Sequence, residues 1–72
     1  MATVIAVVKG DGNNAVFATA DTAAQTAFNT AMANIVAAST TTPFIAASNS
    51  NIMEESGGTF NVQYYALVKY TT

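Results

Sequence analysis

Very few side chains in this sequence could carry chemistry. Among its 72 residues there are two lysines, four acids and three tyrosines, and there is no Cys, His, Arg or Trp. Without thiols or imidazoles the chain lacks the preferred zinc ligands, the commonest general acid–base group and any means of forming a disulfide. The carboxylates of Asp11, Asp21, Glu54 and Glu55 are scattered along the chain. We therefore expect no catalytic residue, no metal site, no cofactor and no enzymatic activity.

One glycine-rich segment resembles a ligand-binding loop in part. The run Gly10–Asn14 places Asp11 and Asn13 at the spacing of a calcium loop, but the closing bidentate glutamate is missing at the required distance. It also overlaps the tripeptide Lys9-Gly10-Asp11, which is similar to integrin-binding loops but too short to be specific. We interpret Gly10–Asn14 as a hairpin turn in which Gly and Asn accept positive φ.

The remaining polar motifs favour solvent-exposed loops. Glu54 and Glu55 could form an acid–base pair, but neighbouring residues on a strand face opposite sides, and Gly57-Gly58 follows them closely. The hydroxyls of Thr40–Thr42 lack a base that could activate them. We interpret Glu54–Gly58 as a solvated loop.

The aromatic residues of the last predicted strand could form a stacking platform for bases or sugars. Only Lys69 is close enough in sequence to hold a phosphate, and two lysines in the whole chain cannot displace the counterions of a duplex. We therefore expect no nucleic-acid partner. Alternation along the strand predicts that Tyr64 and Tyr70 belong to the core and that Tyr65 lies on the opposite face.

Hydrophobic periodicity and turn residues predict the elements that position these side chains. A capping-box spacing between Thr22 and Gln25, with Asp21 as a rival cap, indicates the start of a helix that ends before Pro43. Its apolar stripe includes Val36. The predicted elements, in chain order, are a strand from Thr3 to Lys9, a returning strand from Ala15 to Ala20, the helix, a strand from Phe44 that continues past a bulge to Met53, and a strand from Thr59 to Thr71.

These elements predict one α+β domain that spans residues 1–72. Its antiparallel sheet has three to four strands with one helix on one face, in the order ββαββ, or βαββ if residues 15–20 are loop. The helix should cover the face that bears Tyr64. A single helix leaves the other face open, and we expect Tyr65, Leu67 and Ile5 to form a protein interface there.

Composition indicates what kind of protein this is. Only 8% of the residues are charged, whereas globular chains average about 25%, so the surface consists largely of Thr, Ala, Asn and Ser. A domain of this size is marginally stable. Small domains usually gain stability from disulfides, a metal or a partner, and with the first two excluded we expect a partner surface. The N-terminal apolar run is too short for a signal peptide or a membrane span. We expect a protein that is made in the cytoplasm and has no membrane partner.

We therefore expect a non-enzymatic, self-associating structural protein. Its partners would be further copies of itself or a larger assembly such as a capsid shell, and the favoured role is a small virion component, a phage capsid decoration or cement protein. The alternative is a small dimeric binding or regulatory module that holds a neutral ligand between sheet and helix.

Overall fold

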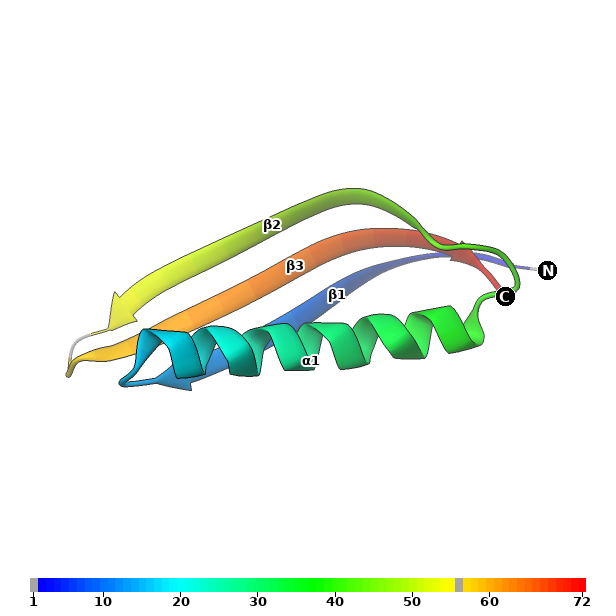
Figure 1. Cartoon of the computed structure of the whole chain (residues 1–72). Helices are drawn as coiled ribbons and strands as arrows, with labels where there is room; N and C mark the ends of the chain where they lie inside the picture. The colour runs from blue at the N-terminus through cyan, green and yellow to red at the C-terminus, as the bar shows by residue number, and fades with distance from the viewer. Residues whose placement is uncertain (1, 56) are drawn as a thin grey trace.

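A computed structural model describes residues 2–55 and 57–72 and shows a βαββ chain (Figure 1). Its elements are β1 (Thr3–Asn14), α1 (Phe17–Ala38), β2 (Phe44–Glu55) and β3 (Thr59–Thr71). The sheet is antiparallel in the order β1-β3-β2, so the last strand lies in the centre. The α+β class and the single helix on one face are confirmed. Of the two predicted strand orders, the three-stranded βαββ form is the one observed.

The predicted hairpin turn at Gly10–Asn14 is wrong, because β1 continues through this segment. Gly10 and Gly12 are buried where α1 crosses the strand. A Cβ atom at Gly10 would lie 2.8 Å from Phe28 Cα, and one at Gly12 would lie 2.8 Å from the backbone nitrogen of Ala24. The glycines are therefore required by the close approach of two backbones. Positive φ angles occur, among the described residues, only at the two glycines of the β2–β3 turn.

The predicted strand at Ala15–Ala20 is also wrong, because the helix begins at Phe17. The helical stripe extends one turn further towards the N-terminus than expected, since Ala20 as well as Ala24 is fully buried against the sheet. The N-cap is Val16, which makes no side-chain cap; its backbone N–H instead donates to Asn14 Oδ1 at 2.9 Å. The periodicity of residues 15–20 was compatible with either element, and packing against the glycines selects the helix.

The predicted capping residues lie inside the helix. Thr22 Oγ1 donates to the carbonyl of Ala18 at 2.9 Å, and Gln25 Nε2 donates to Asp21 Oδ2 at 2.9 Å. The end of the helix is as predicted: Ser39 is the C-cap with an extended backbone, and the chain bends at Thr40 and Thr41 before β2 begins.

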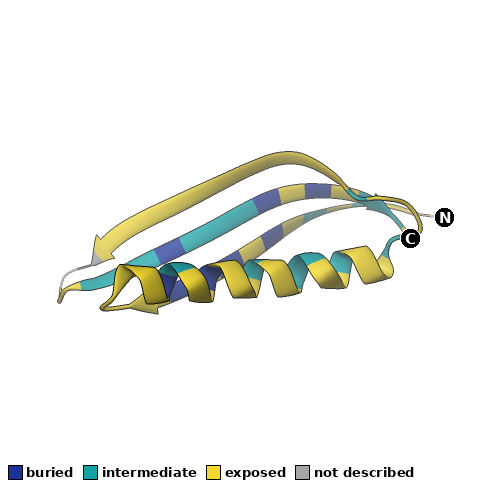
Figure 2. Ribbon diagram, in the orientation of Figure 1, coloured by how far each residue is buried: buried dark blue, intermediate teal, exposed yellow. Residues whose placement is uncertain are grey.

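Small residues dominate the core (Figure 2). One buried cluster consists of Val8, Ala66 and Val68, and the other of Ala20, Ala24 and Val62. Larger side chains pack around them and are only partly buried: Phe28, Ala31, Met32, Ile35 and Tyr70 around the first cluster, and Phe60 and Tyr64 around the second. Val36, which was expected on the apolar stripe, is exposed. The largest fully buried side chains are two valines, so the core is thin.

The last two strands follow the prediction more closely. β3 alternates as expected, with Val62, Ala66 and Val68 buried on the helix side. β2 is continuous, and its bulge falls between Ile45 and Ala47, earlier than expected. Glu54 belongs to this strand, and the predicted loop is reduced to a tight turn through Gly57-Gly58. The side chain of Glu55 lies outside the described part of the structure.

The close contact between β1 and α1 predicts that a Gly→Ala substitution, which usually stabilises a strand, destabilises this protein. Gly→Ala inside a strand normally stabilises the strand by about 0.5–1 kcal/mol. Gly12→Ala should instead destabilise the protein by about 3 kcal/mol, because the new methyl group overlaps the backbone at Ala20 and Ala24 and forces the helix away. Urea denaturation measures this difference. Asn13→Ala, at the neighbouring exposed position of the same strand, is the control and should cost less than about 1 kcal/mol. Equal midpoints for the two variants would contradict the close contact.

Candidate interface on the open face of the sheet

The helix covers one face of β1 and β3 and leaves the opposite face of the sheet open (Figure 1). Antiparallel register places Ile5 opposite Lys69, Val7 opposite Leu67, and Ala47 of β2 on the other side of Leu67. Directly paired residues share a face of a sheet, so these side chains form one continuous surface. No element among the described residues packs on it.

The centre of this surface is apolar and accessible. Ile5 is 67% exposed, Val7 69%, Phe44 65% and Leu67 39%. We call Ile5, Val7, Phe44, Ala47, Tyr65 and Leu67 the open-face patch. A shallow hollow of about 190 Å³ lies within it, lined by Val7, Ala47, Tyr65 and Leu67 together with Ser48, Asn49 and Ala66. An exposed cluster of aliphatic side chains of this kind is typical of a protein contact surface.

Polar contacts border the patch on one side. Lys9 lies opposite Tyr65, and its ammonium is 5.9 Å from the centre of the Tyr65 ring. The same ammonium lies 3.2 Å from Asp11 Oδ2. The Tyr65 hydroxyl donates to Gln63 Oε1, so its ring is held along the sheet and is half-buried. Lys9 is therefore already paired, and a partner that covers the patch need not desolvate a bare cation.

The three residues predicted for the interface, Tyr65, Leu67 and Ile5, are thus brought together on one face. Sequence reasoning did not single out Val7 or Phe44. Val7 could have been found, because it lies two residues after Ile5 and must share its face. Phe44 could not, because the bulge between Ile45 and Ala47 determines which face it takes.

The other chemical candidates are dispersed. Asp11 is paired with Lys9, Asp21 lies on α1, and Glu54 projects from the helix side of β2, opposite Phe60. Within residues 2–55 and 57–72, no group of three acidic side chains is placed to hold a metal ion. The segment Gly10–Asn14, which resembles a calcium loop only in part, is extended strand.

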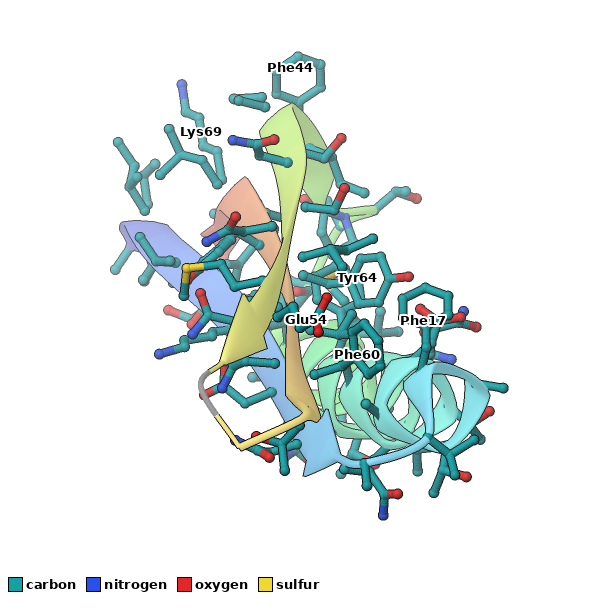
Figure 3. All side chains as sticks on the ribbon, turned by 90° about the vertical axis from the view of Figure 1, so that its left-hand side faces the viewer. Phe17, Phe44, Glu54, Phe60, Tyr64 and Lys69 are labelled. Atoms are coloured by element: carbon teal, nitrogen blue, oxygen red, sulfur yellow. The ribbon has the colours of Figure 1, made fainter. Side chains whose placement is uncertain are left out.

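Tyr64 lies on the helix side as predicted, but near the beginning of α1. It packs with Phe60 against the cluster of Ala20, Ala24 and Val62, and Figure 3 shows it beside Phe17 and Phe60. The rings of Phe17 and Phe60 meet edge-on with centroids 5.8 Å apart. The Tyr64 hydroxyl donates to Asp21 Oδ1. This hydrogen bond to the carboxylate, with a contribution from burial, raises the pKa of Tyr64 above its usual value.

A second hollow lies between α1 and β2. It has a volume of about 410 Å³ and is lined by Phe28, by Tyr64 and Tyr65, and by the segment 48–50. Its walls combine aromatic rings with the hydroxyl groups of two serines. The predicted alternative, a neutral ligand held between sheet and helix, would bind here.

Comparison of the chain with protein-family models, with curated protein sequences and with solved structures gave no match. Among the described residues, no helix is both long enough and apolar enough to cross a bilayer.

The contact between Tyr64 and Asp21 predicts a specific alkaline destabilisation. A phenol whose pKa is higher in the folded than in the unfolded chain contributes stability below its unfolded pKa of about 10, and this contribution is lost as the pH rises through the folded value. The free energy of unfolding should therefore fall from pH 10 upward more steeply in the wild type than in Tyr64→Phe. Urea denaturation at a series of alkaline pH values measures both slopes. Identical slopes for wild type and Tyr64→Phe would contradict this contribution.

Proposed function

We propose that this protein is a non-enzymatic structural component that self-associates through the open face of its sheet. The observation that carries the proposal is the open-face patch, in which Ile5, Val7 and Leu67 lie side by side and no element of the described part of the chain covers them. A sheet that is apolar on both faces requires a cover on each. The helix supplies one cover, and a further protein surface supplies the other.

The size of the open face suits such a contact. Three strands about 4.8 Å apart and 12 to 13 residues long give a face of roughly 40 by 14 Å, about 560 Å² before side-chain relief is counted. A standard protein interface buries about 800 Å² per partner. Two such faces can stack about 10 Å apart with their aliphatic side chains interleaved. Burial of a face of this size can therefore add stability to a protein whose own core is thin.

The composition of the surface supports the structural role. The whole chain carries six formally charged side chains, and Thr, Asn, Ser and Ala make up most of the exposed positions. Covering hydroxyl, amide and methyl groups costs less than covering ammonium groups or carboxylates. We further propose that the assembly is a virion and that the protein is a small decoration or cement component of a capsid shell. Co-purification with phage particles through a density gradient tests this assignment.

A ligand-binding module is the second candidate, and the hollow of about 410 Å³ between α1 and β2 favours it. The two roles differ in what they require of Ser50, which lines this hollow but not the hollow within the open-face patch. A binding module should lose ligand affinity when Ser50→Lys fills the hollow, whereas self-association through the open face should be unaffected by that change.

The open-face patch predicts how substitutions affect association. Val7→Lys and Leu67→Lys should each weaken self-association at least ten-fold, because either ammonium would have to be desolvated in the middle of an apolar contact. Sedimentation velocity across a micromolar concentration series measures the change. Val36→Lys is the matched control, since Val36 is 56% exposed on the helix, away from the sheet, and should leave association unchanged. Loss of association in the control, or its retention in both patch variants, would contradict the proposal.

The low charge predicts how association responds to salt and how the melting temperature responds to a chelator. Because the contact is apolar and its bordering lysine is already paired with Asp11, association should persist when the salt concentration is raised ten-fold. A chelator should leave the melting temperature unchanged. Sedimentation in low and high salt, with and without EDTA, measures both effects. Dissociation by salt would show that ionic contacts hold the assembly together.

A further inference from the structure

The hollow between α1 and β2 has the size and the mixed lining of a small-molecule site. Its volume of about 410 Å³ lies within the usual range for ligand pockets, about 300–1,000 Å³. It is lined by Phe28 of α1, by Tyr64 and Tyr65 of β3 and by the segment 48–50 of β2. Over the described residues α1 packs on β1 and β3 and makes no contact with β2. The helix side of β2 therefore stays open to a ligand.

One wall of the hollow is aromatic. The rings of Phe28 and Tyr64 come from neighbouring elements and are both half-buried, so each presents part of its surface to the hollow. Figure 3 shows the Tyr64 ring on the side of the sheet where α1 lies. The face of an aromatic ring carries partial negative charge and attracts weakly positive C–H groups. This wall therefore favours a ligand with an apolar face rich in C–H groups.

The opposite wall carries hydroxyl groups. Ser50 pairs with Tyr64, and Ser48 lies two residues before it on the same strand, so both serine side chains face the helix side. Both residues are exposed. The one side-chain hydrogen bond described at either position uses the Ser50 N–H, which donates to Asn49 Oδ1 at 2.8 Å, so both hydroxyls are available to a ligand. A hydroxyl group donates and accepts, and a ligand that does both is its best match.

The charges around the hollow disfavour an anionic ligand. Lys9 and Lys69 are the two lysines of the chain, and their register with β3 and β1 places both on the open face of the sheet. Asp21 accepts hydrogen bonds from the Tyr64 hydroxyl and, at 2.9 Å, from Gln25 Nε2. These bonds hold the Tyr64 ring in place before a ligand binds. The carboxylate also repels phosphates and other carboxylates, and neither lysine is near enough to compensate.

We propose that this hollow binds a neutral saccharide, one pyranose unit at a time. A pyranose ring has a face of C–H groups, which suits the rings of Phe28 and Tyr64, and a rim of hydroxyls, which suits Ser48 and Ser50. The aromatic residues of β3 are those that the sequence offers as a platform for bases or sugars, and the lack of cations leaves the sugar. This inference rests on the second candidate function, ligand binding, whose ligand class it names. It does not depend on self-association through the open face.

Titration of the isotope-labelled protein with methyl glycosides, followed by NMR, tests the site. The methyl pyranosides of glucose, galactose and mannose are added separately. At least one should shift the signals of Phe28, Ser50 and Tyr64, with a dissociation constant on the order of 1 mM. The signals of Val7 and Leu67, on the other side of the sheet, should not shift. Inorganic phosphate should leave all these signals unchanged. Cyclohexanol has an apolar ring but a single hydroxyl, and it should bind at least ten-fold more weakly than the pyranoside.

A single substitution removes one hydroxyl from the hollow without touching its aromatic wall. Ser50→Ala should weaken binding of the pyranoside about five-fold, because one hydrogen bond to the ligand is lost. Asn51→Ala is the matched control, since Asn51 is the next residue of β2 and faces the open side, and it should keep the wild-type affinity. Circular dichroism of each variant checks that it is folded. Equal affinities of the wild type and Ser50→Ala would overturn the assignment of this wall.

The remaining outcomes separate this site from the two proposed functions. If none of the three pyranosides shifts the signals at ten-fold above the expected dissociation constant, the saccharide site is overturned and self-association stands. If cyclohexanol binds as tightly as the pyranosides, the hollow is a ligand site, but its assignment to saccharides is overturned. Wild-type pyranoside binding by Leu67→Lys, with wild-type association in Ser50→Ala, supports a site that is independent of the open face. Loss of pyranoside binding in Leu67→Lys would overturn that independence.

Discussion

The direct approach of α1 to β1 determines the rest of this structure. At Gly10 and Gly12 the strand presents bare backbone, and at Ala20 and Ala24 the helix presents only methyl groups, so the two backbones lie closer than side chains usually permit. A helix held this tightly over one outer strand cannot also reach the strand two places away. β3 is covered in part, and β2 is not covered at all. The thin core, the open face and the uncovered outer strand all follow from this one contact.

The same contact explains why the proposed partner surface would stabilise this protein. Small residues allow the close approach but bury little apolar surface, and the fully buried side chains are no larger than valine. The larger apolar residues, among them Ile5, Val7 and Phe44, lie outside the core. A domain of 72 residues already buries only about 60% of the surface exposed in its unfolded chain. Burial of these exposed apolar groups against a partner would therefore add stability, by less than their area alone would give, because association also costs entropy.

The sequence predicted those features that depend on local periodicity. β3 was correct in extent and in the assignment of Tyr64 and Tyr65 to opposite faces, because thirteen residues alternate without interruption. The gathering of Ile5, Leu67 and Tyr65 on one face followed from the same alternation. The errors all arose where tertiary contact overrides local preference. Gly10–Asn14 has the composition of a turn, and it becomes a strand because the helix requires glycine opposite its backbone.

The start of the helix was misplaced for the same reason. Residues 17–20 alternate as a strand would, and only the burial of Ala20 against Gly12 shows that they belong to the helical stripe. The position of the bulge in β2, and with it the placement of Phe44, depends on pairing with β3 and has no signature in the sequence. The residues of the candidate interface could thus be predicted on β3, where periodicity is strong, and only partly on β1 and β2.

We propose that a protein surface completes this sheet on its open side. The most direct test is a dilution series of the wild-type protein followed by two-dimensional NMR spectra with assigned backbone and methyl signals. Self-association through the open face should give concentration-dependent shifts at Val7, Ala47 and Leu67, with signals of the outer helix face such as Val36 unchanged. Spectra that stay constant across the series, together with the diffusion coefficient of a monomer, would contradict it.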